Sequence, residues 1–172
     1  LSPHSDVVAL LVFDHQVRMM NLLTRIGWEA RVLAHEGRSV DAAAAALHTA
    51  AVDVVDYMLF VDEAPLAGVQ GSSTFARTFA AQGPRDSRGR SLRDLDLGTR
   101  LLRYPCSYLI YSAAFDQLLP SAKQAIYAQL WRVLSGQAAE PRYRRLTAAD
   151  RQSILEILGE TMGRTDVARL RE

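Results

Sequence analysis

The stretch from Ser5 to about Arg31 constrains the fold more than any other, because it contains no proline and no glycine before Gly27. Apolar residues and one histidine recur in it at spacings of three and four, which places them on one face of a helix. That face consists of Val8, Val12, His15, Met19, Leu22 and Ile26. A neighbouring face is also mostly apolar and carries Asp6, Leu10, Phe13, Val17 and Met20. Since so much of its circumference is apolar, we expect this helix to be central and covered on several sides.

Capping residues, prolines and glycines divide the rest of the chain into further helices. Ser5 or Asp6 is suited to cap the first helix, which we expect to end between Arg31 and Gly37. Later helices are expected from Ser39 to just before Pro65, over 75–81, over 105–115, from Pro120 to about Ser135, and from Thr147. The sequence therefore predicts an all-α fold, an irregular bundle of about five to six helices around the N-terminal one. A length of 172 residues suits a single domain, with a weak linker at 136–146.

A polar segment over 83–97 alternates arginines with aspartates, and leucines are spaced through it. Its charges nearly balance and its leucines can anchor it, so we expect an ordered loop that runs into a short helix. Forked guanidinium groups bind carboxylates and phosphates, and this loop could hold a haem propionate or a partner's acidic patch. The candidate residues are Arg85, Arg88 and Arg90. Pairing with aspartates of the same loop is the alternative.

The overall composition argues against several classes of protein. The formal net charge is +1, which gives no long-range attraction to nucleic acid. Charged residues interrupt every apolar run before it reaches membrane-spanning length. The single cysteine, Cys106, excludes an internal disulfide framework and a CxxCH haem-attachment motif.

His15 is the most informative polar residue, because it falls in the middle of the main apolar face. A histidine together with a methionine thioether can ligate haem iron within a helical bundle. Met19 is too close on the same helix to take the opposite face of a haem bound by His15, whereas Met58 could do so from a second helix. Metal binding through His15 is a related possibility. The alternative is a core histidine bonded to a carboxylate or carbonyl group, with the methionines filling gaps.

A hydrolase is a second chemical alternative. The run ALLVFDHQ can be interpreted as a buried strand that ends in a catalytic Asp14, with Cys106 as nucleophile, and in this it resembles the opening of isochorismatase-type hydrolases. Those enzymes also use a lysine between the two residues, and the only lysine here is Lys123. A helix over 105–115 places Cys106 near a helix N-terminus, which lowers a thiol pKa. Packing is the simpler role for a lone cysteine. Ferritin-type di-iron sites need Glu-x-x-His motifs, which are absent.

Several phrases together carry a wider resemblance: SDVVALLVFDHQVRMMNLLTR, YMLFVDEAPL, FAAQGPRDSRGRSLRDLDL, TRLLRYPCSYLIYSAAFDQLLP and LTAADRQSILEIL. They resemble a C-terminal region of uncharacterised bacterial proteins, some of which look like exported c-type cytochromes. The resemblance implies a periplasmic or otherwise extracytoplasmic location and a role beside haem groups. It predicts a non-enzymatic helical module that docks on, or shields, a haem-bearing cytochrome domain, with neither nucleic acid nor a membrane span involved. A domain that binds its own haem or metal through His15, and the hydrolase, stay open as alternatives.

Overall fold

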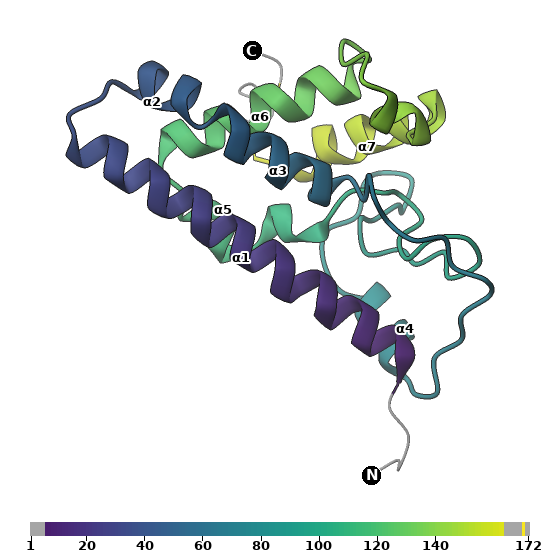
Figure 1. The fold of residues 1–172 in the computed structure, drawn as a ribbon. Coiled ribbons are helices and arrows are strands. Elements are labelled where there is room, and N and C mark those ends of the chain that lie inside the picture. Colours follow the sequence, from purple (N-terminus) through teal and green to yellow (C-terminus); the bar gives the residue numbers. More distant parts are fainter. Residues whose placement is uncertain (1–5, 164–169, 171–172) are drawn as a thin grey trace.

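The computed structural model of the chain describes residues 6–163 and residue 170, and this part contains seven α-helices, two 3₁₀-helices and no strand. The prediction of an all-α fold is confirmed. Figure 1 shows the helices, which are α1 (Val7–His35), α2 (Val40–Ala46), α3 (His48–Met58), α4 (Phe75–Ala80), η1 (Tyr108–Tyr111), α5 (Ala113–Asp116), α6 (Pro120–Leu134), η2 (Pro141–Arg145) and α7 (Ala148–Thr161).

Helix α1 begins and ends where its sequence predicts. The Asp6 carboxylate caps it by accepting the backbone N–H groups of Val8 at 2.9 Å and Ala9 at 3.2 Å, whereas Ser5 lies outside the described residues. Gly37 follows with a left-handed φ of 74°, a conformation that suits glycine just after a helix. The inner face is buried as expected, except that Leu22 is only half-buried and Leu23 is buried beside it.

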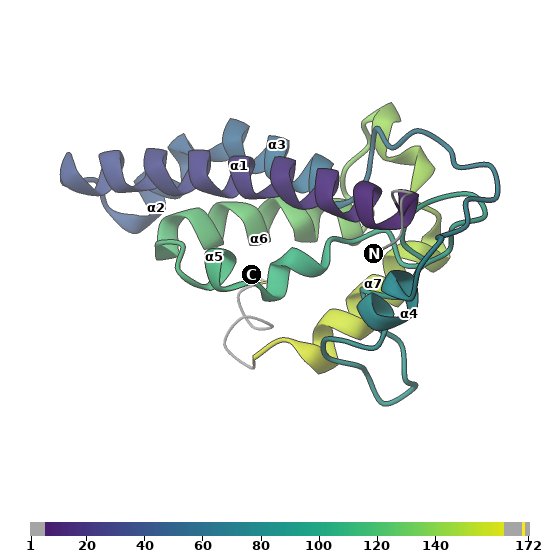
Figure 2. The same cartoon turned by 90° about the horizontal axis from the view of Figure 1, so that it is seen from below.

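Helix α1 packs against α2, α3, α4, α5 and α6, as expected of the helix around which the bundle forms, but these helices leave one of its apolar sides uncovered. Helices α3 and α6 pack together most extensively, and α1 lies along one side of this pair. In Figure 1, and in the view from below in Figure 2, the side of α1 turned away from α3 and α6 faces open space. The second apolar face, which begins with Leu10 and Phe13, is therefore exposed to solvent.

The helix expected from Ser39 to Pro65 is divided and shorter. Leu47, with φ −82° and ψ 1°, interrupts it between α2 and α3, although hydrogen bonds continue on both sides. Helix α3 stops at Met58, and Phe60 then adopts a left-handed φ of 54°. This turn places Phe60 against α1 and makes one wall of the groove described below.

The α-helix expected over 105–115 is also wrong. Ser107 and Ser112 each have an extended backbone, and their hydroxyl groups accept the N–H of Leu109 and Phe115 respectively. Two such caps five residues apart divide the segment into η1 and α5, because a capping serine competes with a continuous helix. Cys106 consequently precedes a short 3₁₀-helix and does not lie at the start of an α-helix.

Two connecting segments are more ordered than loops usually are. The segment over 83–103 is ordered as predicted, but it forms no helix, and Leu95 pairs with Leu102 in an isolated β-bridge. The region 136–146, expected to be a weak linker, contains η2 and the buried Tyr143. The Tyr143 hydroxyl donates to Asp56 of α3 at 2.6 Å and accepts from Gln129 of α6 at 3.0 Å, which fixes this segment to both helices.

Candidate functional site

A groove of about 730 Å³ runs between α1 and α3 and the turn that follows α3. Because α1 and α3 run in opposite directions, Arg25 and Asp53 lie at one end of the groove, while Leu11 and Leu66 lie towards the other. His15 lines the middle. The histidine that the sequence singled out is therefore one of the residues that line the groove.

Aromatic rings and one serine hold His15. Its imidazole stacks on Tyr57, with ring centroids 5.1 Å apart, and on Phe60, with centroids 4.5 Å apart. Its Nε2 lies 2.8 Å from Ser107 Oγ. Ser107 Oγ also accepts the N–H of Leu109, and either it or Nε2 supplies the proton of the bond to His15, depending on the imidazole tautomer. The other ring nitrogen, Nδ1, has no hydrogen-bond partner among the described residues.

Burial lowers the pKa of His15 to about 4, so the ring is neutral at physiological pH. Neutral imidazole is the form that binds metals and donates a single hydrogen bond. Since Nε2 is occupied by Ser107, only Nδ1 is available to anything in the groove. The site offers a neutral donor or ligand atom at the floor of the groove.

The methionines predicted to join His15 are not available. Met19 and Met58 are both fully buried in the core, and neither lines the groove. Among residues 6–163 and 170, no three histidine, cysteine or acidic side chains gather closely enough to hold a metal ion. The structure therefore brings together His15 and Ser107, and it does not bring Met58 into the groove beside His15.

The groove walls are strongly acidic. They carry five carboxylates and two arginines, a formal excess of three negative charges, and the carboxylates are Asp14, Asp53, Asp56, Asp62 and Glu63. Burial raises the pKa of Asp56 and of Glu63, although hydrogen bonds from Tyr143 and from the Leu101 N–H partly offset the shift. Their charged forms are thus incompletely compensated by the protein.

The Ser107–His15 pair has the distance of a nucleophile and its base, and we did not anticipate it from the sequence. Ser107 is fully buried, however, and its hydroxyl also caps η1. A serine nucleophile must reach its substrate, so burial favours a structural role for this pair.

The structure contradicts both features on which the hydrolase interpretation depended, the strand that ends in Asp14 and a reactive Cys106. Residues 10–15 belong to helix α1 and not to a strand. Cys106 is fully buried, and burial raises the pKa of its thiol to about 12, so the thiolate needed for attack does not form near neutral pH. Asp14 lines the groove on the α1 wall.

The polar segment over 83–97, which we call the arginine loop, already has acidic partners within the protein for its three candidate arginines. Arg85 donates to Asp94 at 3.1 Å and to two backbone carbonyls. Arg90 donates to Asp86 at 2.6 Å and to Glu156 of α7 at 2.8 Å. Arg88 also donates to Glu156, but its side chain stays 67% exposed. Pairing with aspartates of the same loop, the alternative given above, describes Arg85 and Arg90, whereas the acidic partner of Arg88 lies on α7.

The outer face of α1 is the second unusual surface. We use this name for Leu10, Phe13, Val17, Met20 and Trp28, which recur at helical spacing opposite the buried face. Phe13 is 62% exposed and Trp28 is 64% exposed. Val7 and Val32 of the same helix are exposed as well, and the one large exposed apolar residue elsewhere in the described chain is Val40. Exposed apolar area is therefore concentrated on a single helix.

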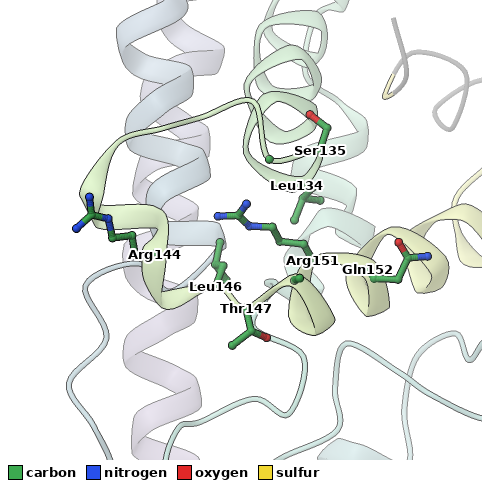
Figure 3. Close-up of a pocket in the computed structure, with 9 residues that line it drawn as sticks. Leu134, Ser135, Arg144, Leu146, Thr147, Arg151 and Gln152 are labelled. Carbon is green, nitrogen blue, oxygen red and sulfur yellow. The ribbon is translucent and has the colours of Figure 1, made fainter.

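A smaller hollow of about 470 Å³ lies where α6, η2 and α7 meet (Figure 3). Figure 3 shows Arg151 extending from α7 across this hollow, between Ser135 and Leu146. Its guanidinium donates to the carbonyl of Tyr143 at 3.1 Å and lies beside the C-terminal end of α6, where the helix dipole favours a positive charge. The arginine thus has a structural explanation, and the hollow is not a candidate site.

None of the helices in the described part of the chain is both long and apolar enough to cross a membrane. In comparisons with known proteins, no family model, no curated protein and no solved structure matches this chain.

Proposed function

We propose that this chain is a non-enzymatic docking module that binds a partner protein through the outer face of α1. The observation that carries the proposal is the concentration of exposed apolar residues on one side of that helix. Contiguous apolar surface of this kind is typical of interaction sites, and aromatic side chains at their centres contribute most of the binding free energy. The arginine loop has a smaller part, because its guanidinium groups are paired internally.

The partner in this proposal is the haem-bearing domain of an exported c-type cytochrome, outside the cytoplasm. Its support is the sequence resemblance described above. The chemistry is compatible, since the rim of a haem macrocycle is largely apolar and a flat apolar helix face would shield it from water.

The test compares two surface variants of the chain purified from its native source. The double variant Phe13→Asp/Val17→Asp places charge in the centre of the outer face, and Val40→Asp is the matched control because Val40 is equally apolar and exposed on α2. We expect the wild-type chain and Val40→Asp to co-purify with a haem-bearing polypeptide that shows a Soret band. The double variant should lose that band while its circular dichroism is unchanged.

Two results would contradict the proposal. Absence of haem absorption from the wild-type assembly would remove the haem-bearing partner. Retention of the band by the double variant would show that docking does not use the outer face. A Soret band that stays with the isolated chain and disappears in His15→Ala would instead assign the haem to this chain.

A further inference from the structure

Outer-face docking leaves the groove between α1 and α3 unused, although its volume of about 730 Å³ suits a small molecule. The groove opens on a different side of α1 from the outer face, because His15 belongs to the inner face of the helix. None of the outer-face residues lines the groove.

Charge selects the class of ligand. Of the two arginines in the groove, Arg25 is already bonded to Asp53 at 3.0 Å. Asp14 and Asp62, by contrast, form no ion pair with any residue that the structure describes. Asp14 lies on the α1 wall, one helical turn from Arg18, and Asp62 lies in the turn after α3; with Arg18 counted, the groove still has a formal excess of negative charge. A positively charged ligand would be stabilised between Asp14 and Asp62.

Aromatic rings provide the second selecting feature. Tyr57 and Phe60 both line the groove beside His15, and the guanidinium carbon of Arg18 lies 5.2 Å from the Tyr57 ring centroid. The wall therefore already accommodates a cation over an aromatic face. A left-handed backbone is unfavourable for a residue such as Phe60, and the fold retains it where the ring contacts His15.

We propose that this groove binds a small organic cation, namely an amine or guanidinium group attached to an apolar or aromatic body. The cationic head lies between Asp14 and Asp62, and the body packs against Tyr57 and Phe60. The unpartnered Nδ1 of His15 forms a hydrogen bond with a hydroxyl group of the same ligand.

The test uses tyramine as the probe, because it combines an ammonium group, an aromatic ring and a hydroxyl group. Isothermal titration with the full chain should show tyramine binding at least about tenfold more tightly than the neutral 4-ethylphenol or the anionic 4-hydroxyphenylacetate. The variant Asp14→Asn/Asp62→Asn should weaken tyramine binding by at least about tenfold. The control Asp116→Asn, at an exposed acid outside the groove, should bind as the wild type does.

Each other outcome overturns the inference. Absence of tyramine binding removes the site, and equal binding of 4-ethylphenol makes it a plain apolar pocket. Tighter binding of the anion would assign recognition to the arginines, and unchanged binding in Asp14→Asn/Asp62→Asn would misplace the cationic head. Phe13→Asp/Val17→Asp should bind tyramine normally, so the docking proposal and this one fail separately.

Discussion

At the scale of single residues, His15 shows what the sequence could predict and what it could not. The helical spacing correctly placed His15 among apolar neighbours on the inner face of α1. It could not reveal Ser107, which lies 92 residues away and reaches His15 only through the tertiary fold. Cys106 shows the same limit, because its burial depends on packing around η1 and not on its neighbours in the chain.

Protonation of His15 should destabilise the fold in mildly acidic solution. The folded pKa of about 4 lies below the unfolded value of 6.5, so the unfolded chain binds the proton more readily. The stability that comes from neutral His15 is complete above about pH 6.5 and is lost as the pH falls towards 4, by roughly 3 kcal/mol. Urea unfolding of wild type and His15→Gln across this range measures the difference.

The variant His48→Gln is the control, because His48 is exposed and its loss should leave the wild-type pH dependence in place. Parallel stability curves for wild type and His15→Gln would show that His15 is not held in its neutral form by the fold.

Cys106 should be inert in the native protein. Its side chain has no exposed surface, so a thiol reagent cannot reach it. Burial also raises its pKa to about 12, so the reactive thiolate does not form near neutral pH. With Ellman's reagent at pH 8, we expect no reaction in buffer and one thiol per chain in guanidinium chloride. Rapid native reaction would mean that the segment around η1 opens readily.

At the scale of elements, α1 has two apolar faces, and its sequence did not distinguish the covered face from the open one. Both faces satisfy the spacing of three and four residues, so periodicity alone predicts burial for either of them. The choice depends on where α3 and α6 lie, which is a tertiary property. Strong local signals gave better predictions: the helix starts expected at Pro120 and Thr147 are those of α6 and α7, and Thr147 forms a capping box with Asp150.

Two adjacent methionines provide a matched test of these faces. Met19 is fully buried, whereas Met20 is 38% exposed on the outer face. We expect Met19→Ala to lower the free energy of unfolding by about 2–5 kcal/mol, because it leaves a cavity in the core. Met20→Ala should change it by less than about 0.5 kcal/mol. Chemical denaturation of both variants gives the comparison, and equal losses would contradict the assigned orientation of α1.

At the scale of the whole molecule, the arginine loop joins the middle of the chain to helix α7 near its C-terminal part. The Asp86 carboxylate accepts the backbone N–H groups of Arg88 and Arg90 and the Nε–H of Arg90. The Nη2 of Arg90 donates to Glu156 of α7. Balanced charge predicted that the loop is ordered, but the partner on α7 lies more than sixty residues further along the chain and was not foreseen. One domain over the whole chain stays a prediction.

The two arginines that reach Glu156 differ in burial and should differ in effect. The Arg90 side chain is 15% exposed, so Arg90→Ala leaves the buried Asp86 carboxylate without its partner and should cost about 2–4 kcal/mol. Arg88→Ala should cost less than about 0.5 kcal/mol, as is usual for exposed ion pairs. Thermal unfolding measures both. Similar losses from both variants would indicate that Glu156, and not the buried Asp86 pair, dominates.

The division of α1 into an inner and an outer face has a genetic consequence. Substitutions on the inner face change how much folded protein a cell retains, whereas substitutions on the outer face change assembly and leave abundance alone. A library of all single variants of this helix, scored once for abundance and once for assembly, should give two periodic profiles half a turn out of phase. The tolerance of α1 to substitution should therefore be enough to distinguish the residues needed for folding from those needed for assembly.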